Sequence, residues 1–258
     1  MFIQAYGTGT LDIHALNFVQ SDMNRYTWQN ICPSPVNETG LDVLLLLRNA
    51  FFIHLCASTG KRPIIVKTHN VNAEMNGIHP FPAMLTAGSV YLIRDPRDVV
   101  ISFAKHFGNS IDEAIGHMNS KKYVLRDKDI CGFHMTGSWS DNVKSWKNAC
   151  VIKYEDLLED PKENFTTILS ALNLRVDKRR LGKAIRLCEL ERVRKQEKTK
   201  PFSETSPKTD SFFHHGTSGH WKDILSPDQS RKIESDHREV MEQYGYLQSN
   251  ISEISNVA

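Results

Sequence analysis

The sequence lacks the features that direct a chain to nucleic acid, to an oxidising compartment or into repeats. Its formal net charge is only +2 over 258 residues, so any basic site has to be local and no nucleic-acid partner is expected. Its five cysteines are odd in number and have no CxxC spacing, which favours free thiols in a reducing, cytoplasmic setting over disulfides or zinc. Internal repeats and long low-complexity tracts are also missing.

Long hydrophobic runs are missing as well. The N-terminal stretch MFIQAYGTGT has neither a basic region nor a long apolar core, so it is not a signal peptide. The most apolar run, 41–57, is interrupted by Asp42 and Arg48 and is too short and too polar to span a bilayer. We predict instead a buried helix over 41–58, closed by Gly60, within a single domain covering residues 1–258.

The stretch 89–107 predicts a strand, a tight turn and a helix. Val90–Ile93 is a short β-branched run typical of a buried parallel strand. Asp95 can accept from the first free amides of a helix, and Pro96 suits its first turn. Apolar residues then recur at helical spacing: Val99, Val100, Phe103 and Phe107. Arg94 therefore lies at the carboxyl end of a strand beside a helix N-terminus, where α/β proteins bind phosphorylated ligands.

Two further strands end in polar residues. The run 63–66 is followed by Lys67, Thr68 and His69, which we expect to share a sheet edge with Arg94. The run 149–152 is followed by Lys153, Tyr154, Glu155 and Asp156. Taken alone, Lys67 also fits a solvated lysine, and Tyr154 also fits a tyrosine packed at a strand end.

Helical patterns fill much of the remaining chain, and two stretches read as irregular. Residues 1–40 predict irregular structure with short helices, and 195–217 predicts a loop rich in Lys, Ser, Thr and Pro. The predicted helices cover Ser110–Ser120, Thr136–Lys147, Pro161–Leu172, Asp177–Lys195 and Ser226–Tyr244.

The motif after the strand at 90–93 resembles one from a known enzyme family. Arg94, Asp95, Pro96, Arg97, Asp98 and Ser102 match the 3′-phosphate-binding segment of sulfotransferases that use 3′-phosphoadenosine 5′-phosphosulfate. The resemblance extends over roughly residues 41–245. It implies a three-layer α/β fold with a mostly parallel sheet, similar to the P-loop nucleotide-binding proteins, and it implies that Arg94 and Ser102 hold the 3′-phosphate.

The same resemblance gives roles to the other strand ends. Lys-Thr-His after a strand implies His69 as the base that removes the acceptor's proton, a task suited to an imidazole. Lys67 matches a lysine near the transferring sulfuryl group, where a cation stabilises charge on its oxygens. Tyr154 takes the place of a tyrosine that contacts adenine.

A second phosphate-binding segment of the family is matched by 212–223, with changes. Glycine and tryptophan are kept at Gly216, Gly219 and Trp221, whereas His214 and His215 replace an Arg-Lys pair. Because histidine is charged only below about pH 6.5, phosphate affinity here should fall as the pH rises past that value. A metal site is a competing interpretation, but adjacent histidines rarely converge on one ion, and we expect no metal.

One motif of the family has no counterpart in the sequence. The family's first strand leads into a glycine-containing loop that cradles the 5′-phosphosulfate. Ala5–Thr10 has two glycines, but it follows no adequate strand and lacks the loop's Lys or Arg and its Trp. We interpret Ala5–Thr10 as a turn. The sequence is therefore expected to begin just after that strand and loop, through a start codon downstream of the true one, a frameshift, or decay to a relative without catalysis.

These features predict transfer of a sulfuryl group from 3′-phosphoadenosine 5′-phosphosulfate to a hydroxyl or amine. The acceptor would be a small molecule, a glycan or a lipid. The alternative is an inactive or truncated relative that only binds the nucleotide. A nucleoside or small-molecule kinase is a third class, disfavoured because there is no GxxxxGK[ST] loop.

Overall fold

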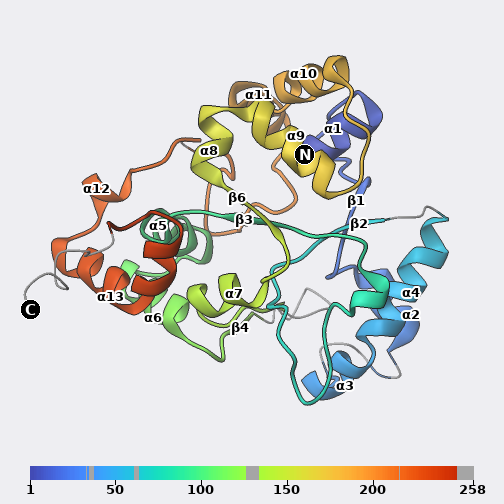
Figure 1. Cartoon of the computed structure of the whole chain (residues 1–258), viewed down its shortest axis with the longest axis horizontal. Helices are drawn as coiled ribbons and strands as arrows, with labels where there is room; N and C mark the ends of the chain where they lie inside the picture. Colours follow the sequence, from blue (N-terminus) through green and yellow to red (C-terminus); the bar gives the residue numbers. More distant parts are fainter. Residues whose placement is uncertain (33, 35–37, 61–63, 126–133, 215, 249–258) are drawn as a thin grey trace, which may run out of the picture.

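The structure is a computed structural model that describes residues 1–32, 34, 38–60, 64–125, 134–214 and 216–248 (Figure 1). The strands are β1 (Val19–Ser21), β2 (Ile65–Lys67), β3 (Val90–Ile93), β4 (Val124–Leu125), β5 (His134–Met135) and β6 (Cys150–Lys153). The helices are α1 (Phe2–Thr8), α2 (Arg25–Ile31), α3 (Leu41–Leu46), α4 (Arg48–Thr59), the 3-10 turn η1 (Ala83–Leu85), α5 (Pro96–Phe107), α6 (Ile111–Asn119), α7 (Trp139–Ser145), α8 (Tyr154–Glu159), α9 (Pro161–Ala171), α10 (Lys178–Leu187), α11 (Leu190–Thr199), α12 (Trp221–Ile224) and α13 (Pro227–Gln243).

Parallel strand pairs form the centre of the fold, which confirms the predicted α/β class. β1 pairs with β2, and β3 pairs with β6, from Val90 opposite Cys150 to Ile93 opposite Lys153. A short antiparallel pair, β4 with β5, forms a separate ladder. In the part of the chain that the structure describes, the two parallel pairs are separate ladders rather than one continuous sheet.

The segment from β3 to α5 forms as its local sequence dictates. Asp95 caps α5 by accepting from the backbone amide of Arg97 at 2.9 Å, and Pro96 occupies the first turn. Gly108 ends the helix in a left-handed conformation with φ of 62°. The Arg94 side chain is thereby placed at the junction of a strand and a helix N-terminus.

Helices gather around the strands (Figure 1) and pack through clusters of apolar side chains. α1, α9, α10 and α11 pack together with the phenylalanines of the following segment, and α2 packs on α4 around Trp28 and Phe51. The C-terminal α13 packs against α5 and α6 through Ile233 and Met241. Trp146 and Val143 are buried. No helix in the described ranges is long and apolar enough to cross a membrane.

Several predicted boundaries need correction. The helix expected over 41–58 is divided at Leu47 into α3 and α4, and the helix expected over 177–195 is divided at Cys188 and Glu189 into α10 and α11. The break at Glu189, whose backbone is extended, lets α11 turn and bury Val193.

The irregular stretches also contain regular structure. β1 lies where only irregular structure and short helices were predicted, and Ala5–Thr10 is mostly the end of α1 rather than a separate turn. The loop predicted over 195–217 is helical as far as Thr199. Cys32, Cys150 and Cys188 form no disulfide bond.

Candidate functional site

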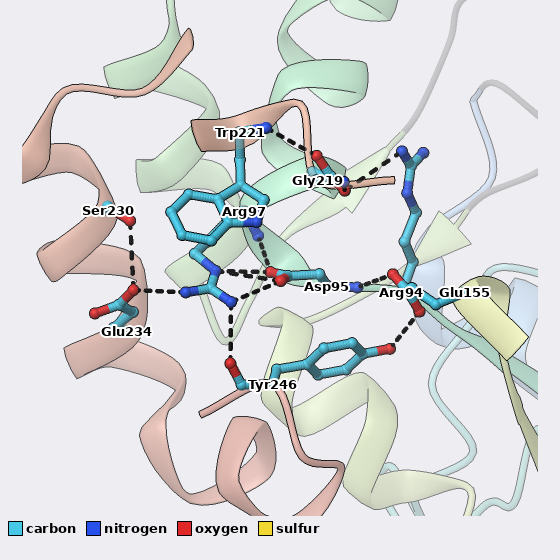
Figure 2. A network of polar contacts seen from close by, with 10 residues as sticks. Arg94, Asp95, Arg97, Glu155, Gly219, Trp221, Ser230, Glu234 and Tyr246 are labelled. Carbon is cyan, nitrogen blue, oxygen red and sulfur yellow. Dashed lines mark hydrogen bonds and ion pairs between the residues drawn. The ribbon is translucent and has the colours of Figure 1, made fainter. Parts of the chain in front are cut away.

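A network of buried charges fixes the turn after β3. The guanidinium of Arg97 donates to both oxygens of Asp95, to Glu234 of α13 at 2.7 Å and to the backbone carbonyl of Tyr246 at 3.0 Å. It also lies 3.8 Å from the centre of the Trp221 ring (Figure 2). These contacts hold α12, α13 and Tyr246 against the start of α5, next to Arg94.

Asp98 holds the glycine-containing segment against the same helix. Its carboxylate is buried and accepts from the backbone amides of Gly219 at 2.6 Å and Trp221 at 3.0 Å. Arg94 lies 3.7 Å from this carboxylate and donates to the backbone carbonyl of Thr217 at 3.1 Å. Figure 2 shows Arg94 beside this segment, so the two stretches that sequence analysis linked to a phosphate do meet.

The Arg94 guanidinium also lies over the ring of Tyr154, 4.6 Å from its centre. Burial raises the pKa of Tyr154, with the Arg94 cation opposing the shift and the Glu155 and Asp98 carboxylates adding to it. The Nε of Arg94 is buried and has no hydrogen-bond partner among the described residues. Such a donor is costly to leave unused, so this arrangement suits an anionic ligand.

The other residues predicted to bind the nucleotide are Ser102, His214, His215 and Gly216. Ser102 is exposed, and its hydroxyl donates to the Asp98 carbonyl within α5, with no contact to Arg94 in the structure as described. The Nδ1 atom of His214 lies 3.2 Å from the Nζ atom of Lys105, a cation of α5 that sequence analysis overlooked. Gly216 has a φ of 66°, and His215 lies outside the described residues.

Lys67 is the last residue of β2, one residue beyond the predicted end of the strand, and His69 follows two positions later. The Lys67 amine pairs with Glu204 at 2.6 Å, both side chains being 45% exposed. The His69 side chain is exposed by surface area, and its ring lies 5.0 Å from that of His134 between centres. Loss of solvation, followed by the charges of Lys67 and His134, lowers the pKa of His69, so the ring is neutral at physiological pH. A neutral imidazole is the form that accepts a proton.

A buried carboxylate behind His69 was not found by sequence analysis. Asp22 precedes α2, and its Oδ2 accepts from Arg48 at 2.6 Å, from Asn70 at 2.8 Å and from Thr68. Burial alone would raise the pKa of Asp22, but His134, Arg48 and Thr68 outweigh burial and lower it. The short β1 and the absence of a motif gave no signal for this group.

The structure therefore presents two groups of polar residues, one after each parallel pair. Arg94 and Asp98 follow β3 and Tyr154 follows its partner strand β6, whereas Lys67, His69 and Asp22 lie around the end of β2. Between the described residues, no hydrogen bond or ion pair joins the two groups directly. A cavity between α9 and α10, lined by Pro161 and Arg186 among others, contains none of the predicted site residues. No metal-binding group of three or more His, Cys, Asp or Glu side chains occurs in the described ranges.

Parallel strand pairs with cationic and imidazole side chains at their carboxyl ends define an α/β protein of the nucleotide-binding type. The profile of the sulfotransferase domain family matches residues 57–245, and the chain belongs to this family. That range includes every residue predicted for the site.

Individual relatives that match the chain at low identity are also named as sulfotransferases. Cytosolic sulfotransferase 15 of Arabidopsis thaliana is 28% identical over 156 residues, covering 56% of this chain and 44% of the relative. Sulfotransferase 1C2 of Homo sapiens is 25% identical over 166 residues, covering 59% and 54%. The chain thus spans about half the length of these curated relatives.

Solved structures share the fold. Mouse sulfotransferase SULT7A1 complexed with PAP superposes with a TM-score of 0.51 at 19% identity, covering 72% of this chain and 69% of that one. Retinol dehydratase in complex with androsterone and the inactive cofactor PAP gives a TM-score of 0.54 at 17% identity, covering 93% and 85%. These similarities support the P-loop-like architecture expected from the sequence.

Proposed function

We propose that this protein transfers a sulfuryl group from 3′-phosphoadenosine 5′-phosphosulfate to a hydroxyl or amine. The observation that carries the proposal is the position of Lys67 and His69, two residues apart at the end of β2 and within the range matched by the family. In the transfer, the acceptor's oxygen or nitrogen attacks sulfur, the bond from sulfur to the bridging phosphate oxygen breaks, and His69 takes the acceptor's proton. Lys67 stabilises charge on the sulfuryl and bridging oxygens.

In this proposal the nucleotide lies against the second group. Arg94 holds the 3′-phosphate with its unused Nε donor, and Ser102 helps from the exposed face of α5. Tyr154 contacts the adenine, and the Arg94 guanidinium lies over its ring. His214, His215 and Gly216 complete the phosphate site, with Lys105 supplying the permanent charge that a histidine pair lacks.

The acceptor and setting follow the relatives. Androsterone and retinol, named with the neighbouring structures, are small apolar alcohols, so we propose a small-molecule hydroxyl acceptor, with a glycan or lipid alcohol as the wider class. Relatives named cytosolic sulfotransferases support a cytoplasmic setting. The proposal keeps a single catalytic domain over residues 1–258.

A second function is favoured by one observation. The Lys67 amine is occupied by the Glu204 carboxylate, which would have to leave before a sulfuryl group could approach. A protein in which this pair persists would bind the nucleotide without transferring anything.

Calorimetric titration with 3′-phosphoadenosine 5′-phosphate, with 5′-AMP as the reference ligand, tests the nucleotide site. Losing a charged hydrogen bond of about 1.5–3 kcal/mol, Arg94→Ala should bind the 3′-phosphorylated nucleotide roughly 10- to 150-fold more weakly, while 5′-AMP binding stays unchanged. Arg238→Ala, on the exposed face of α13, is the matched control. Equal binding by wild type and Arg94→Ala would refute the phosphate role.

Transfer itself separates the two functions. Folded wild-type protein that forms sulfated product from added alcohols, with His69→Gln about 10²- to 10⁴-fold slower, supports the enzyme. Nucleotide binding without any product supports the binding protein.

A further inference from the structure

Two imidazoles, rather than one, lie at the end of β2. The rings of His69 and His134 are 5.0 Å apart between centres, with their planes at 68°. His134 is the first residue of β5, whose next residue is fixed by a hydrogen bond from the Met135 amide to the Asn70 side chain at 2.7 Å. Because Asn70 directly follows His69, the two histidines are held in a fixed relation.

Behind His134 lies a carboxylate oxygen that nothing else uses. The Oδ1 of Asp22 is buried and has no hydrogen-bond partner within the described residues, and the Nε2 of His134 lies 3.7 Å from it. The other oxygen, Oδ2, is already bonded to Arg48, Thr68 and Asn70, so the carboxylate cannot turn away. Asp22 is therefore a fixed negative charge with one free acceptor directed at His134.

The surroundings of His69 disfavour a proton on its ring. Desolvation and then the Lys67 cation lower the pKa of His69, and the Asp22 and Glu204 carboxylates only partly offset them. His134 has the Asp22 carboxylate as its nearest charge, although Arg48 binds the same carboxylate from the other side.

We propose that His134 is the group on which a proton taken up at this site comes to rest, stabilised there by Asp22. In the reaction proposed above, on which this step rests, the acceptor's O–H bond breaks as an N–H bond forms on His69. The second N–H proton of His69 then passes to a ring nitrogen of His134, directly or through one water. His69 is left neutral, and the positive charge resides beside Asp22.

A titration of the histidine side chains by NMR tests this on the full chain, without nucleotide or acceptor. The variants are His134→Gln, which can still donate to Asp22, and His79→Gln, an exposed control that pairs with Glu74. Removing a positive charge about 5 Å away should raise the pKa of His69 by about one unit in His134→Gln. The control should leave it unchanged, and in the wild type His134 should take up a proton at higher pH than His69.

Two results would overturn the proposal. Either the pKa of His69 moves no further in His134→Gln than in His79→Gln, or His69 takes up its proton before His134 in the wild type. Since this titration needs no catalysis, a chain that shows the coupling but forms no sulfated product would refute the proposed function and leave His134 as the resting place of the proton.

Activity gives an independent readout. In His134→Gln, kcat should fall at least tenfold, the acidic limb of the pH–rate profile should move to higher pH with the pKa of His69, and affinity for 3′-phosphoadenosine 5′-phosphate should stay the same. A His134→Gln variant with the wild-type rate and pH profile would overturn the relay.

Discussion

Replacing Arg48 by Met should destabilise the fold more than any exposed charge change. The Arg48 side chain is 1% exposed and donates to Asp22 at 2.6 Å and to the Pro80 carbonyl at 3.1 Å. Methionine can fill the space against Phe52 and Phe81, so the apolar packing is largely kept. The substitution removes the cation that balances the buried Asp22 carboxylate. Removing one partner of a buried ion pair costs about 3–5 kcal/mol of the free energy of unfolding.

That loss is large against a total free energy of unfolding of about 5–15 kcal/mol. With a urea dependence of about 3 kcal/mol per molar, the midpoint of unfolding should fall by about 1 to 1.7 M. The assay is urea unfolding followed by circular dichroism and tryptophan fluorescence, to which the buried Trp28 beside Phe51 contributes.

Two companions make the test specific. Arg238→Met removes an exposed ion pair with Glu242 and should cost less than about 1 kcal/mol. The double variant Arg48→Met with Asp22→Asn removes both charges and should be more stable than Arg48→Met alone. If Arg48→Met unfolds at the same urea concentration as Arg238→Met, then the Asp22 carboxylate does not depend on Arg48, and our account of this pair is wrong.

Two further predictions concern acid and a glycine. Because folding lowers the pKa of Asp22, its stabilising contribution is complete above the unfolded value of about 3.9 and is lost as the pH falls below it. The difference in urea midpoint between wild type and Asp22→Asn should therefore shrink from pH 6 to pH 3, and a constant difference would contradict this. Gly216→Ala should cost about 1–2 kcal/mol, since φ is 66° and a Cβ would lie 2.6 Å from Leu190. As the control, Gly116→Ala, within α6 and with open space around it, should not lower the urea midpoint.

The parts of the fold that follow from neighbouring residues were predictable. The strand at Val90–Ile93 and the helix from Pro96 formed as expected because Asp95 and Pro96 act within one turn of the helix they start. The capping box of Ser226 and Gln229 likewise opens α13 close to the predicted position. Each of these signals is complete within a few residues, so no distant contact had to be known.

The parts that depend on distant contacts were not predictable. The division at Leu47 coincides with the point where Arg48 turns inward to reach Asp22, a partner 26 residues away. Lys67 and His69 were identified only through a family motif, whereas their neighbours Glu204 and His134 come from segments that no motif joins to β2. From the sequence alone, a charged residue is taken to be exposed to solvent, because its distant partner is known only from the fold.

The hydrogen bond from the Trp221 amide to Asp98 also limits how early the site can fold during synthesis of the chain. Its partners are separated by 123 residues, so at about 5–20 residues per second the ribosome needs on the order of 10 s after making α5 before this bond can form. During that interval the Asp98 carboxylate and the Arg94 guanidinium emerge without the segment that will cover them. A nascent chain halted before Trp221 should therefore leave α5 open to chaperones and proteases, and the nucleotide site would be among the last features of the protein to mature.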